Sequence, residues 1–591
     1  MRMRYFNLLL LLTLMLGATG LSAQQTEKIS PSLRTAFQER GQADFLVVLK
    51  AQAELPASVR GLRKEERGWL VYEAARNLAE RTQPRLREML KQRAVPYQPY
   101  WVVNAVRTQG DEALARAIAA LPEVAQLQLN PRFQLDVQEG SGAAISWRND
   151  AVEWGIEKIG ADQVWELGFT GQGVVIGGQD TGYEWNHPAL KTSYRGWDGT
   201  QADHNYNWHD AIHEIDSLNG PPYEAFANPC GLDSPVPCDD NNHGTHTMGT
   251  MAGQESGEGV SIGVAPDVRW IGCRNMERGW GSPASYLECF EWFLAPTNLD
   301  GEAPNPALAP HIINNSWACP AIEGCVPENF DLLATAVNNL RAAGILVVVS
   351  AGNSGSNCGT ISTPAAIFPN SFTVGATRQN DTIANFSSRG VVTIDSSGRL
   401  KPNVAAPGVG IRSAIRSGGY ASLSGTSMAG PHVAGAAALL ISANPQLAGQ
   451  VELIEEILQN TAKPMLSDQD CGGVPGTSVP NAVYGFGRID VLAAVEAALG
   501  ITDTEDAVPE NSTMLAFPNP ADGTINLQLS HMLQTDGLLR LFDAKGQLLR
   551  QQPWPVAQPL LLLNLEELPA GIYSCQLTEG DKVWATRFIK K

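Results

Sequence analysis

Five short apolar runs, separated by longer stretches, constrain the fold of this chain more than any other feature. Each run is apolar almost throughout instead of alternating with polar residues, which is typical of strands in a parallel sheet buried on both faces. The runs are 174–178, 268–271, 312–313, 345–349 and 372–374. Stretches between several of them, such as 329–343, have helical character. We therefore expect an α/β domain whose parallel sheet is flanked by helices.

The beginning of the chain predicts export. Arg2 and Arg4 precede an apolar stretch at 6–16, and Ala23 is a small residue suited to cleavage, which is the order of features in a secretory signal peptide. The apolar stretch is shorter than the roughly 20 residues that a membrane span requires. We expect a signal peptide at residues 1–23, no transmembrane segment after its removal, and a secreted, extracellular or cell-surface protein.

The residues after the signal divide into several regions. A chain of 591 residues is too long for one hydrophobic core. Residues 24–140 alternate strand-like and helix-like segments, which predicts a small α/β module. Its expected strands are 44–50, 100–108 and 124–129, and its expected helices are 65–93 and 112–121. The Gly-rich residues 138–144 predict an exposed, cleavable connection to the main domain, 141–500.

Near the C-terminus the pattern changes to a period of two. Residues 501–514 are acidic and polar and predict a linker. Within 515–591, Ile525, Leu527 and Leu529 alternate with polar residues, and turns containing glycine recur. Short strands with regular turns predict a small β-sandwich.

Nine cysteines fit an exported, oxidising context. None of them shows the paired Cys-x-x-Cys spacing of a zinc site, and Cys575 stands alone near the end. Three pairs are close in sequence, which leaves a fourth by elimination. These pairs are Cys230 with Cys238, Cys273 with Cys289, Cys319 with Cys325, and Cys358 with Cys471. Sequence alone does not fix this connectivity.

Three short segments contain the residue types of a nucleophilic triad. A serine hydroxyl needs a base within hydrogen-bond reach and a group that orients this base. Ser427 precedes a helix-like stretch of small residues, where backbone N–H groups can stabilise an oxyanion. His243 is the candidate base, and Asp180, at the end of an apolar strand, is the candidate orienting carboxylate. Asp, His, Ser is one chain order of such triads.

Other roles for these segments remain open or are opposed by the sequence. His246 competes with His243 for the role of base, and we interpret it as structural. The Asp-Thr-Gly that begins at Asp180 also occurs in aspartic peptidases, but these need a second such carboxylate, and no second copy is found. Asn353 follows a strand and can donate its amide to an oxyanion, although asparagine is also common in turns.

Residues 150–500 resemble the subtilisin-like serine peptidases, the subtilases. The matching segments are Gln179–Gly182, His243–Gly249, Ile313–Trp317, Ala351–Ser354, Phe386–Gly390, Lys401–Gly408 and Gly425–Gly435. The resemblance implies a subtilisin-like parallel sheet with Asp180, His243 and Ser427 as the triad. It also implies an oxyanion hole formed by Asn353 and the Ser427 backbone N–H, and a reaction that requires no cofactor.

The resemblance further implies where substrate and propeptide bind. Ser316, Trp317 and Ala318 form an edge that pairs with extended substrate backbone. The opposite wall of the specificity pocket is formed by Ser350, Ala351 and Gly352. Residues 24–140 resemble a ferredoxin-like subtilase propeptide, an intramolecular inhibitor and folding chaperone that autoprocessing removes, with a new N-terminus near residues 138–150.

An insertion at residues 203–242 departs from the family pattern and is expected to border the cleft. It is rich in Asp, His and Asn and contains two cysteines. Many subtilases bind structural calcium, and the acidic stretches 233–240 and 255–258 can supply oxygen ligands. Acidic loops are, however, usually only solvated.

Residues 515–591 resemble the C-terminal sorting domain of the type IX secretion system. The carrying features are Phe517–Pro520, Leu568–Tyr573 and the ending Arg587–Lys591. The resemblance implies a Bacteroidetes-type bacterium, export across the outer membrane and the type IX machinery as a partner.

The sequence therefore predicts a secreted serine endopeptidase that hydrolyses proteins or peptides through an acyl-enzyme. The alternative is a surface binding or adhesion protein on an inactive peptidase scaffold, although no triad residue is missing. An α/β-hydrolase esterase is opposed by the chain order, because that fold runs Ser, Asp or Glu, His. The net charge of -19 argues against nucleic-acid binding.

Overall fold

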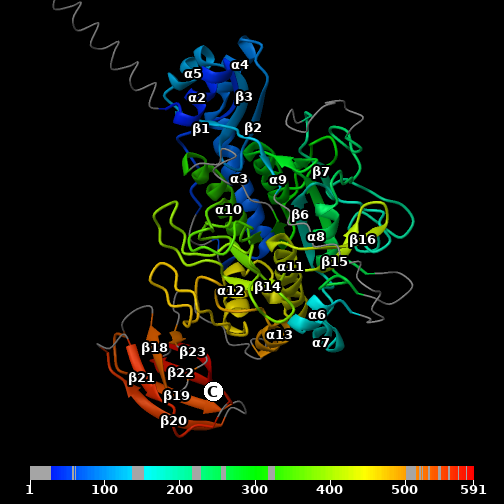
Figure 1. Cartoon of the computed structure of the whole chain (residues 1–591). Helices are drawn as coiled ribbons and strands as arrows, with labels where there is room; N and C mark the ends of the chain where they lie inside the picture. The colour runs from blue at the N-terminus through cyan, green and yellow to red at the C-terminus, as the bar shows by residue number, and fades with distance from the viewer. Residues whose placement is uncertain are drawn as a thin grey trace, which may run out of the picture. The chain divides into compact units, whose positions relative to one another are not determined.

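The structure is a computed structural model of the chain. It describes residues 28–55, 59, 61–135, 152–215, 228–254, 261–316 and 327–500, and residues 514–590 apart from 518–520, 522, 530–532, 544–546, 557–559, 570 and 581. The predicted signal peptide, the connection 138–144 and residues 501–513 of the predicted linker lie outside the described residues. The chain divides into two compact units, residues 1–499 and 500–591 (Figure 1).

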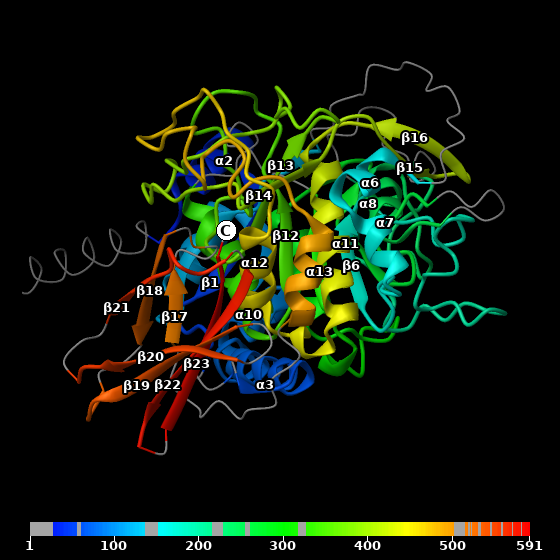
Figure 2. The same cartoon turned by 90° about the horizontal axis from the view of Figure 1, so that it is seen from below.

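A parallel sheet of seven strands forms the centre of the first unit, and it confirms the predicted α/β fold (Figures 1 and 2). The strand order is β14-β13-β12-β11-β6-β8-β7, and every neighbouring pair is parallel. The strands are β6 (Val175–Asp180), β7 (Trp208–Asp210), β8 (Arg269–Arg274), β11 (Ile312–Asn315), β12 (Leu346–Ser350), β13 (Phe372–Thr377) and β14 (Val404–Pro407). All five apolar runs are strands of this sheet.

Helices cover both faces of the sheet, which explains why its strands are apolar throughout. Along β12, Leu346 and Val348 belong to one buried cluster, whereas Val347 and Val349 belong to another. The helices of the first cluster are α6 (Trp154–Ile159), α7 (Ala161–Glu166), α8 (His243–Ala252), α11 (Thr426–Ala443), α12 (Val451–Asn460) and α13 (Val491–Gly500) (Figure 2). The second cluster contains α9 (Pro283–Leu294) and α10 (Pro327–Ala342).

Residues 28–135 form a module with its own antiparallel sheet, ordered β2-β3-β1-β4, and its own buried cluster. The strands are β1 (Gln42–Leu49), β2 (Tyr97–Tyr100), β3 (Ala105–Asp111) and β4 (Val124–Leu129). The helices are α2 (Pro31–Arg40), α3 (Lys64–Thr82), α4 (Pro84–Gln92) and α5 (Glu112–Ala119). Helix α3 also packs on the main domain, because its Val71, Ala75 and Ala79 belong to the cluster that contains α9 and α10.

Two expected elements of this module differ in extent from the structure. The single helix expected over 65–93 is divided at Gln83, because Pro84 begins α4 at a position where a missing N–H does no harm. The strand expected over 100–108 is also divided. A turn at residues 101–104 joins β2 to β3, with Asn104 in the left-handed region at a φ of 38°.

The second unit consists of two antiparallel sheets, ordered β17-β18-β21 and β20-β19-β22-β23. The strands are β17 (Met514–Phe517), β18 (Thr524–Leu529), β19 (Gly537–Asp543), β20 (Leu548–Trp554), β21 (Leu560–Asn564), β22 (Gly571–Glu579) and β23 (Lys582–Lys590). Both sheets contribute to one buried cluster, which includes Ile525, Leu527 and Leu529. The period-two pattern therefore predicted these strands correctly.

Three of the expected disulfides are present, namely Cys230–Cys238, Cys273–Cys289 and Cys358–Cys471. Cys319 and Cys325 lie outside the described residues, and Cys575 is free and buried. Within the part of the chain that the structure describes, none of the helices combines the length and apolar character needed to cross a membrane.

Candidate active site

The parallel topology brings three strand ends to one edge of the sheet. Strand β6 ends at Asp180, its neighbour β11 ends at Asn315, and β12, on the other side of β11, ends at Ser350. In register, Asn315 lies beside Gln179 on one side and Val349 on the other. Because ligands bind outside the carboxyl ends of parallel strands, this edge is the expected position of a site.

Asp180 and His243 form a buried pair at this edge. The Asp180 Oδ1 atom lies 2.7 Å from His243 Nδ1, and each residue is 1% exposed. A carboxylate only accepts, so Nδ1 carries the proton and Nε2 is left as the acceptor. The Nε2 atom is buried and has no hydrogen-bond partner among the described residues. This is the arrangement that a general base requires.

Two glycines permit the close approach of these segments. Gly182 lies in the turn after Asp180 with a φ of 109°, and a Cβ atom there would lie 1.8 Å from the Cys238 carbonyl oxygen. A Cβ atom at Gly244, the residue after His243, would lie 2.0 Å from the Gly182 carbonyl oxygen. Only glycine fits at either position, so the turn after β6 contacts the first turn of α8 directly.

Ser427 lies in the first turn of α11 and packs against the end of β11. Its Oγ donates to the Ser316 carbonyl oxygen at 3.1 Å, and the Ser316 Oγ donates to the Ser427 carbonyl oxygen at 3.0 Å. The Ser427 hydroxyl is thus bonded to Ser316 and not to His243 Nε2 in this structure. Catalytic hydrogen bonds are often absent without substrate and form only in the complex.

Asn353 is oriented by the residue before Ser427. Its Oδ1 accepts hydrogen bonds from the backbone N–H and the hydroxyl of Thr426, both at 2.9 Å. A Cβ atom on Gly425 would lie 3.6 Å from Asn353 Nδ2 and also 3.6 Å from the Ser427 backbone nitrogen. Two N–H donors therefore border the same small space beside Ser427, as an oxyanion hole requires.

Of the residues expected to bind substrate, those that the structure describes lie at the same edge of the sheet. Ser350 and Ala351 are buried at the end of β12, and Gly352 follows with its N–H bonded to the Thr426 hydroxyl at 3.1 Å. Ser316 is buried against Ser427. Trp317 and Ala318 lie outside the described residues.

His246 has different surroundings from His243. Its Nε2 lies 3.0 Å from the Ile411 carbonyl oxygen and 3.1 Å from that of Ala421, on the two strands of a hairpin formed by β15 (Ile411–Ile415) and β16 (Gly419–Leu423). Burial lowers the pKa of His246 to about 3, so it is a neutral donor that ties α8 to this hairpin.

A short strand from the N-terminal module occupies a second edge near the site, which the sequence did not predict. Strand β5 (Phe133–Gln134) pairs antiparallel with β10 (Trp280–Gly281), which in turn pairs with β9 (Met276–Glu277). Phe133 is 1% exposed, and its ring lies 4.9 Å from that of Tyr286. Two-residue strands give no periodic signal, so only the structure reveals this contact.

The same strand leads towards His243. The Leu135 N–H donates to the Gly279 carbonyl oxygen at 2.7 Å. A Cβ atom on Gly279 would lie 3.7 Å from Leu135 Cβ and 3.3 Å from Nδ2 of Asn241, two residues before His243. An extended segment of this chain therefore lies along β10, and its Leu135 and the residue Asn241 both lie beside Gly279.

The carboxylates of residues 233–240 have partners within the protein. Asp233 pairs with His213, Asp239 accepts five hydrogen bonds from its own surroundings, and Asp240 pairs with Arg274. No group of three or more His, Cys, Asp or Glu side chains among the described residues is arranged to hold a metal ion. The other acidic stretch, 255–258, lies outside the described residues.

Comparison with known proteins identifies both parts of the chain. The sequence model of the subtilase family matches residues 171–487, and that of the secretion system C-terminal sorting domain matches residues 515–591. A sorting domain of this kind indicates a secreted or cell-surface protein.

Several curated proteins are similar over long stretches. Bacillopeptidase F of Bacillus subtilis (strain 168) is 33% identical over 503 residues, which is 80% of this chain but 32% of that protein. Subtilisin Savinase of Lederbergia lenta is 34% identical over 345 residues, 58% of this chain and 98% of its own length. An alkaline protease of Alkalihalobacillus alcalophilus is 32% identical over 373 residues, 63% of this chain and 76% of its own. The chain therefore belongs to the subtilase family of serine peptidases.

Proposed function

We propose that this protein is a secreted endopeptidase that cleaves peptide bonds in proteins through an acyl-enzyme. The observation that carries the proposal is the buried Asp180–His243 pair with an unpartnered Nε2 at the same sheet edge as Ser427. Family membership gives the same reaction class. No described residue supports a competing reaction at this edge.

In the first half of the reaction, the Ser427 Oγ attacks the scissile carbonyl carbon, and His243 Nε2 takes the hydroxyl proton. The carbon–nitrogen bond then breaks, and His243 gives that proton to the leaving amine. In the second half, His243 takes a proton from water, whose oxygen attacks the carbonyl carbon of the Ser427 ester. The bond from this carbon to Ser427 Oγ then breaks, His243 returns the proton to Oγ, and the acid is released. Asp180 keeps Nδ1 protonated and stabilises the imidazolium that forms.

The oxyanion is stabilised by donors that are already in place. Asn353 Nδ2 and the Ser427 backbone N–H border the space beside the nucleophile, and Thr426 fixes the Asn353 amide. Because these donors need no rearrangement, they stabilise developing charge more than the neutral carbonyl. We assign extended substrate to the edges at Ser316–Ala318 and Ser350–Gly352, together with β10.

We propose that residues 24–140 are an intramolecular inhibitor removed by autoprocessing. The pairing of β5 with β10 supports this proposal, since it places a segment of the module where we expect substrate. The rest of the interface is extensive. Glu291 of α9 accepts hydrogen bonds from the backbone N–H groups of Trp101 and Val102 at 2.6 and 2.9 Å.

Helix α3 provides a second anchor far from β5. The Arg67 guanidinium donates to the carbonyl oxygens of Arg341 and Ala342 at the end of α10, and to that of Gly449. Lys64 Nζ donates to the Ala309 carbonyl oxygen at 2.7 Å. A cation at the C-terminal end of a helix is favoured by the helix dipole. We further propose that the signal peptide and the sorting domain direct export through the type IX machinery.

The test is casein hydrolysis by purified full-length protein, with a serine-directed fluorophosphonate as covalent probe. We expect hydrolysis that the probe abolishes, label on Ser427, and a new N-terminus near residues 138–150. Ser427→Ala should lower hydrolysis by at least about 10³-fold and block release of the N-terminal module. Ser442→Ala, on the same helix, is the matched control and should behave as the wild type.

Parallel samples with calcium and with a chelator test the calcium expectation. Casein hydrolysis that persists in Ser427→Ala would contradict the assignment of the nucleophile. A folded wild-type protein without its N-terminal module that neither cleaves nor takes label would favour the inactive binding scaffold.

A further inference from the structure

Asp239, four residues before His243, is a buried carboxylate with an unusually complete set of hydrogen bonds. It is 5% exposed. Its Oδ1 accepts from the Thr181 hydroxyl at 2.9 Å and from the backbone N–H groups of Asn241 and Asn242 at 2.9 and 3.1 Å. Its Oδ2 accepts from the Thr245 backbone N–H at 3.0 Å and the Thr245 hydroxyl at 2.6 Å. Five donors on one carboxylate indicate an ionised group held rigidly in place.

The two threonine hydroxyls connect the segments that carry the proposed base and its orienting carboxylate. Thr181 follows Asp180, and its hydroxyl accepts from the Gly244 N–H at 3.0 Å. Thr245 follows Gly244, and its hydroxyl accepts from the Glu184 N–H at 3.1 Å. Each hydroxyl therefore donates to Asp239 and accepts from the opposite segment. With its proton fixed on Asp239, each hydroxyl must present its lone pairs to the N–H across the gap.

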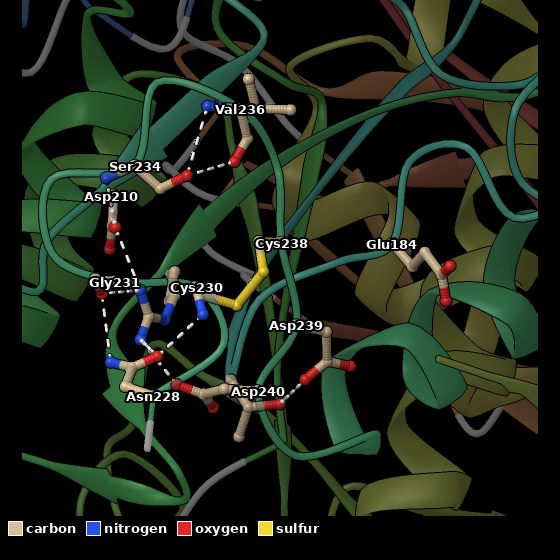
Figure 3. Close-up of a disulfide and its surroundings, with 12 residues drawn as sticks. Glu184, Asp210, Asn228, Cys230, Gly231, Ser234, Val236, Cys238, Asp239 and Asp240 are labelled. Carbon is tan, nitrogen blue, oxygen red and sulfur yellow. Dashed lines mark hydrogen bonds and ion pairs between the residues drawn. A yellow bond between two sulfur atoms is a disulfide. The ribbon is translucent and has the colours of Figure 1, made fainter. Parts of the chain in front are cut away.

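Asp239 is itself fixed by the residues on either side (Figure 3). The disulfide Cys230–Cys238 ends immediately before it, and the Cys238 carbonyl oxygen accepts from the Tyr183 N–H at 3.2 Å. Asp240 follows, with its Oδ2 2.6 Å from Arg274 Nη2 and its Oδ1 2.9 Å from the Arg278 N–H. The carboxylate thus extends from a backbone that is held on both sides.

We infer that Asp239 is a positioning residue for catalysis, which sets the geometry of the Asp180–His243 pair by clamping the turn after β6 onto the first turn of α8. The inference rests on the proposed function, in which His243 is the base. Asp239 acts through Thr181 and Thr245 and does not contact the reacting atoms. Small displacements of a base matter because a shift of about 1 Å can lower a rate about 100-fold.

Replacing Asp239 with Asn tests the clamp with little change in volume. An amide has one acceptor oxygen, so at least two of the five donors then face an NH₂ group. We expect kcat to fall by about 10- to 100-fold and KM to stay within about twofold, because the residue does not touch substrate. The assay uses a chromogenic peptide with the sequence Phe-Gln-Leu, taken from 133–135.

A pair of variants at Thr181 separates positioning from folding. Thr181→Val keeps the shape of the side chain but removes the bridging hydroxyl, so kcat should fall about tenfold. Thr181→Ser retains the hydroxyl and should restore most of that loss. Combining Thr181→Val with Asp239→Asn should cost less than the sum of the single effects, because both break the same connection.

Asp210→Asn is the matched control, because this buried carboxylate pairs with Arg274 and accepts from the backbone N–H groups of Ile212 and Ser234, and not from the triad segments. We expect it to lower the thermal midpoint while kcat per folded molecule stays within about twofold. All precursors are matured by a trace of tagged wild-type enzyme, which is then removed, so a slow variant is still assayed without its N-terminal module.

The outcomes are distinguishable from a failure of the proposed function. If Ser427→Ala remains active, the proposed reaction itself is wrong. If the wild type is active but Asp239→Asn loses kcat only in parallel with its thermal midpoint, or if Asp210→Asn or Thr181→Ser loses as much, the positioning role is wrong. A folded Asp239→Asn with reduced kcat, unchanged KM and rescue at Thr181→Ser supports it.

Discussion

Two places in the first unit bury ionisable groups, and they stabilise them in opposite ways. Around His243, the carboxylates of Asp180 and Asp239 accept hydrogen bonds from donors of the same domain, in the turn after β6 and at the start of α8. Where the N-terminal module contacts the main domain, the Arg67 guanidinium and the Glu291 carboxylate form hydrogen bonds with atoms of the opposite part.

This difference distinguishes a permanent set of hydrogen bonds from an interface whose two parts can separate. A buried charge without partners costs several kcal/mol, so the charges around His243 must keep their donors throughout the life of the protein. In the proposed release of the module, Arg67 and Glu291 return to water, and hydration replaces the lost hydrogen bonds. An interface of this kind is specific while it is closed and not prohibitively costly to open.

The largest expected effect comes from a substitution in the permanent arrangement around Asp180 and His243. In Gly182→Ala, the new Cβ atom would lie 1.8 Å from the Cys238 carbonyl oxygen, and the residue would keep an unfavourable positive φ. We expect the free energy of unfolding to fall by roughly 2–4 kcal/mol, measured by denaturant titration in a Ser427→Ala background that prevents self-digestion.

Gly199→Ala is the matched control for this prediction. Gly199 has a similar φ of 101° but nothing within 4 Å of a Cβ atom. It should lose only the conformational part, about 1 kcal/mol. Equal losses in the two variants would mean that the packing of Gly182 against Cys238 does not matter.

The next effect concerns the separable interface. Arg67→Ala removes a guanidinium that is 2% exposed and bonded to three carbonyl oxygens. We expect the cleaved N-terminal module to dissociate from the rest of the chain at least about tenfold faster, since lost bonds to a charged group cost about 1.5–3 kcal/mol. Size-exclusion chromatography after cleavage in trans measures this rate.

Arg76→Ala serves as its control, because Arg76 lies on the same helix but forms an exposed pair with Glu80. Its loss should leave the dissociation rate within about twofold. An Arg67→Ala module that dissociates no faster than the Arg76→Ala module would show that α3 is not an anchor.

The smallest expected effect is a pH dependence of the same interface. Burial raises the pKa of Glu291 to about 8, whereas a solvated glutamate titrates near 4.3. The assembled form therefore holds the proton more tightly than the separated form, so association is strongest at acidic pH and weakens as the pH rises from about 4.5 to 8. Burial lowers the pKa of Lys64 to about 8, so its titration acts mainly above this range.

We expect the dissociation constant of the cleaved module to rise between pH 5 and pH 8, measured by calorimetry with the Ser427→Ala protein. Glu291→Gln should flatten this dependence, whereas Glu302→Gln, at an exposed carboxylate, should not. Tighter binding at pH 8 than at pH 5 would mean that the protonation of Glu291 does not govern the interface.

The sequence predicted the parts of the fold whose signals are local and repeated. The five apolar runs and the alternation at Ile525–Leu529 each extend over enough residues to define a period. The helix break at Gln83 was missed because helical composition continues past it, although Pro84 marks it. Strands β5 and β10 have two residues each, and their pairing depends on contacts across the chain.

At the candidate site, the sequence indicated the side chains that bear chemistry but not those that hold them. Asp180, His243 and Ser427 stand in distinctive segments, and the structure brings Asp180 and His243 into contact. Asp239 was interpreted only as part of an acidic stretch that could bind calcium. Its connection to Thr181 and Thr245 exists only after β6 and α8 have packed, so no spacing along the chain reveals it.

The pairing of β5 with β10 has a consequence for how the protein would be switched on. If the module is the inhibitor that we propose, β5 competes with outside substrates while residues 28–135 remain joined to the main domain, at an effective concentration on the order of millimolar, typical of short tethers. Once the connection is cut, the competitor is diluted into the surrounding volume. Secretion into a large volume would then act as the trigger. The cleaved module and the main domain remain associated when they are concentrated and dissociate when they are diluted.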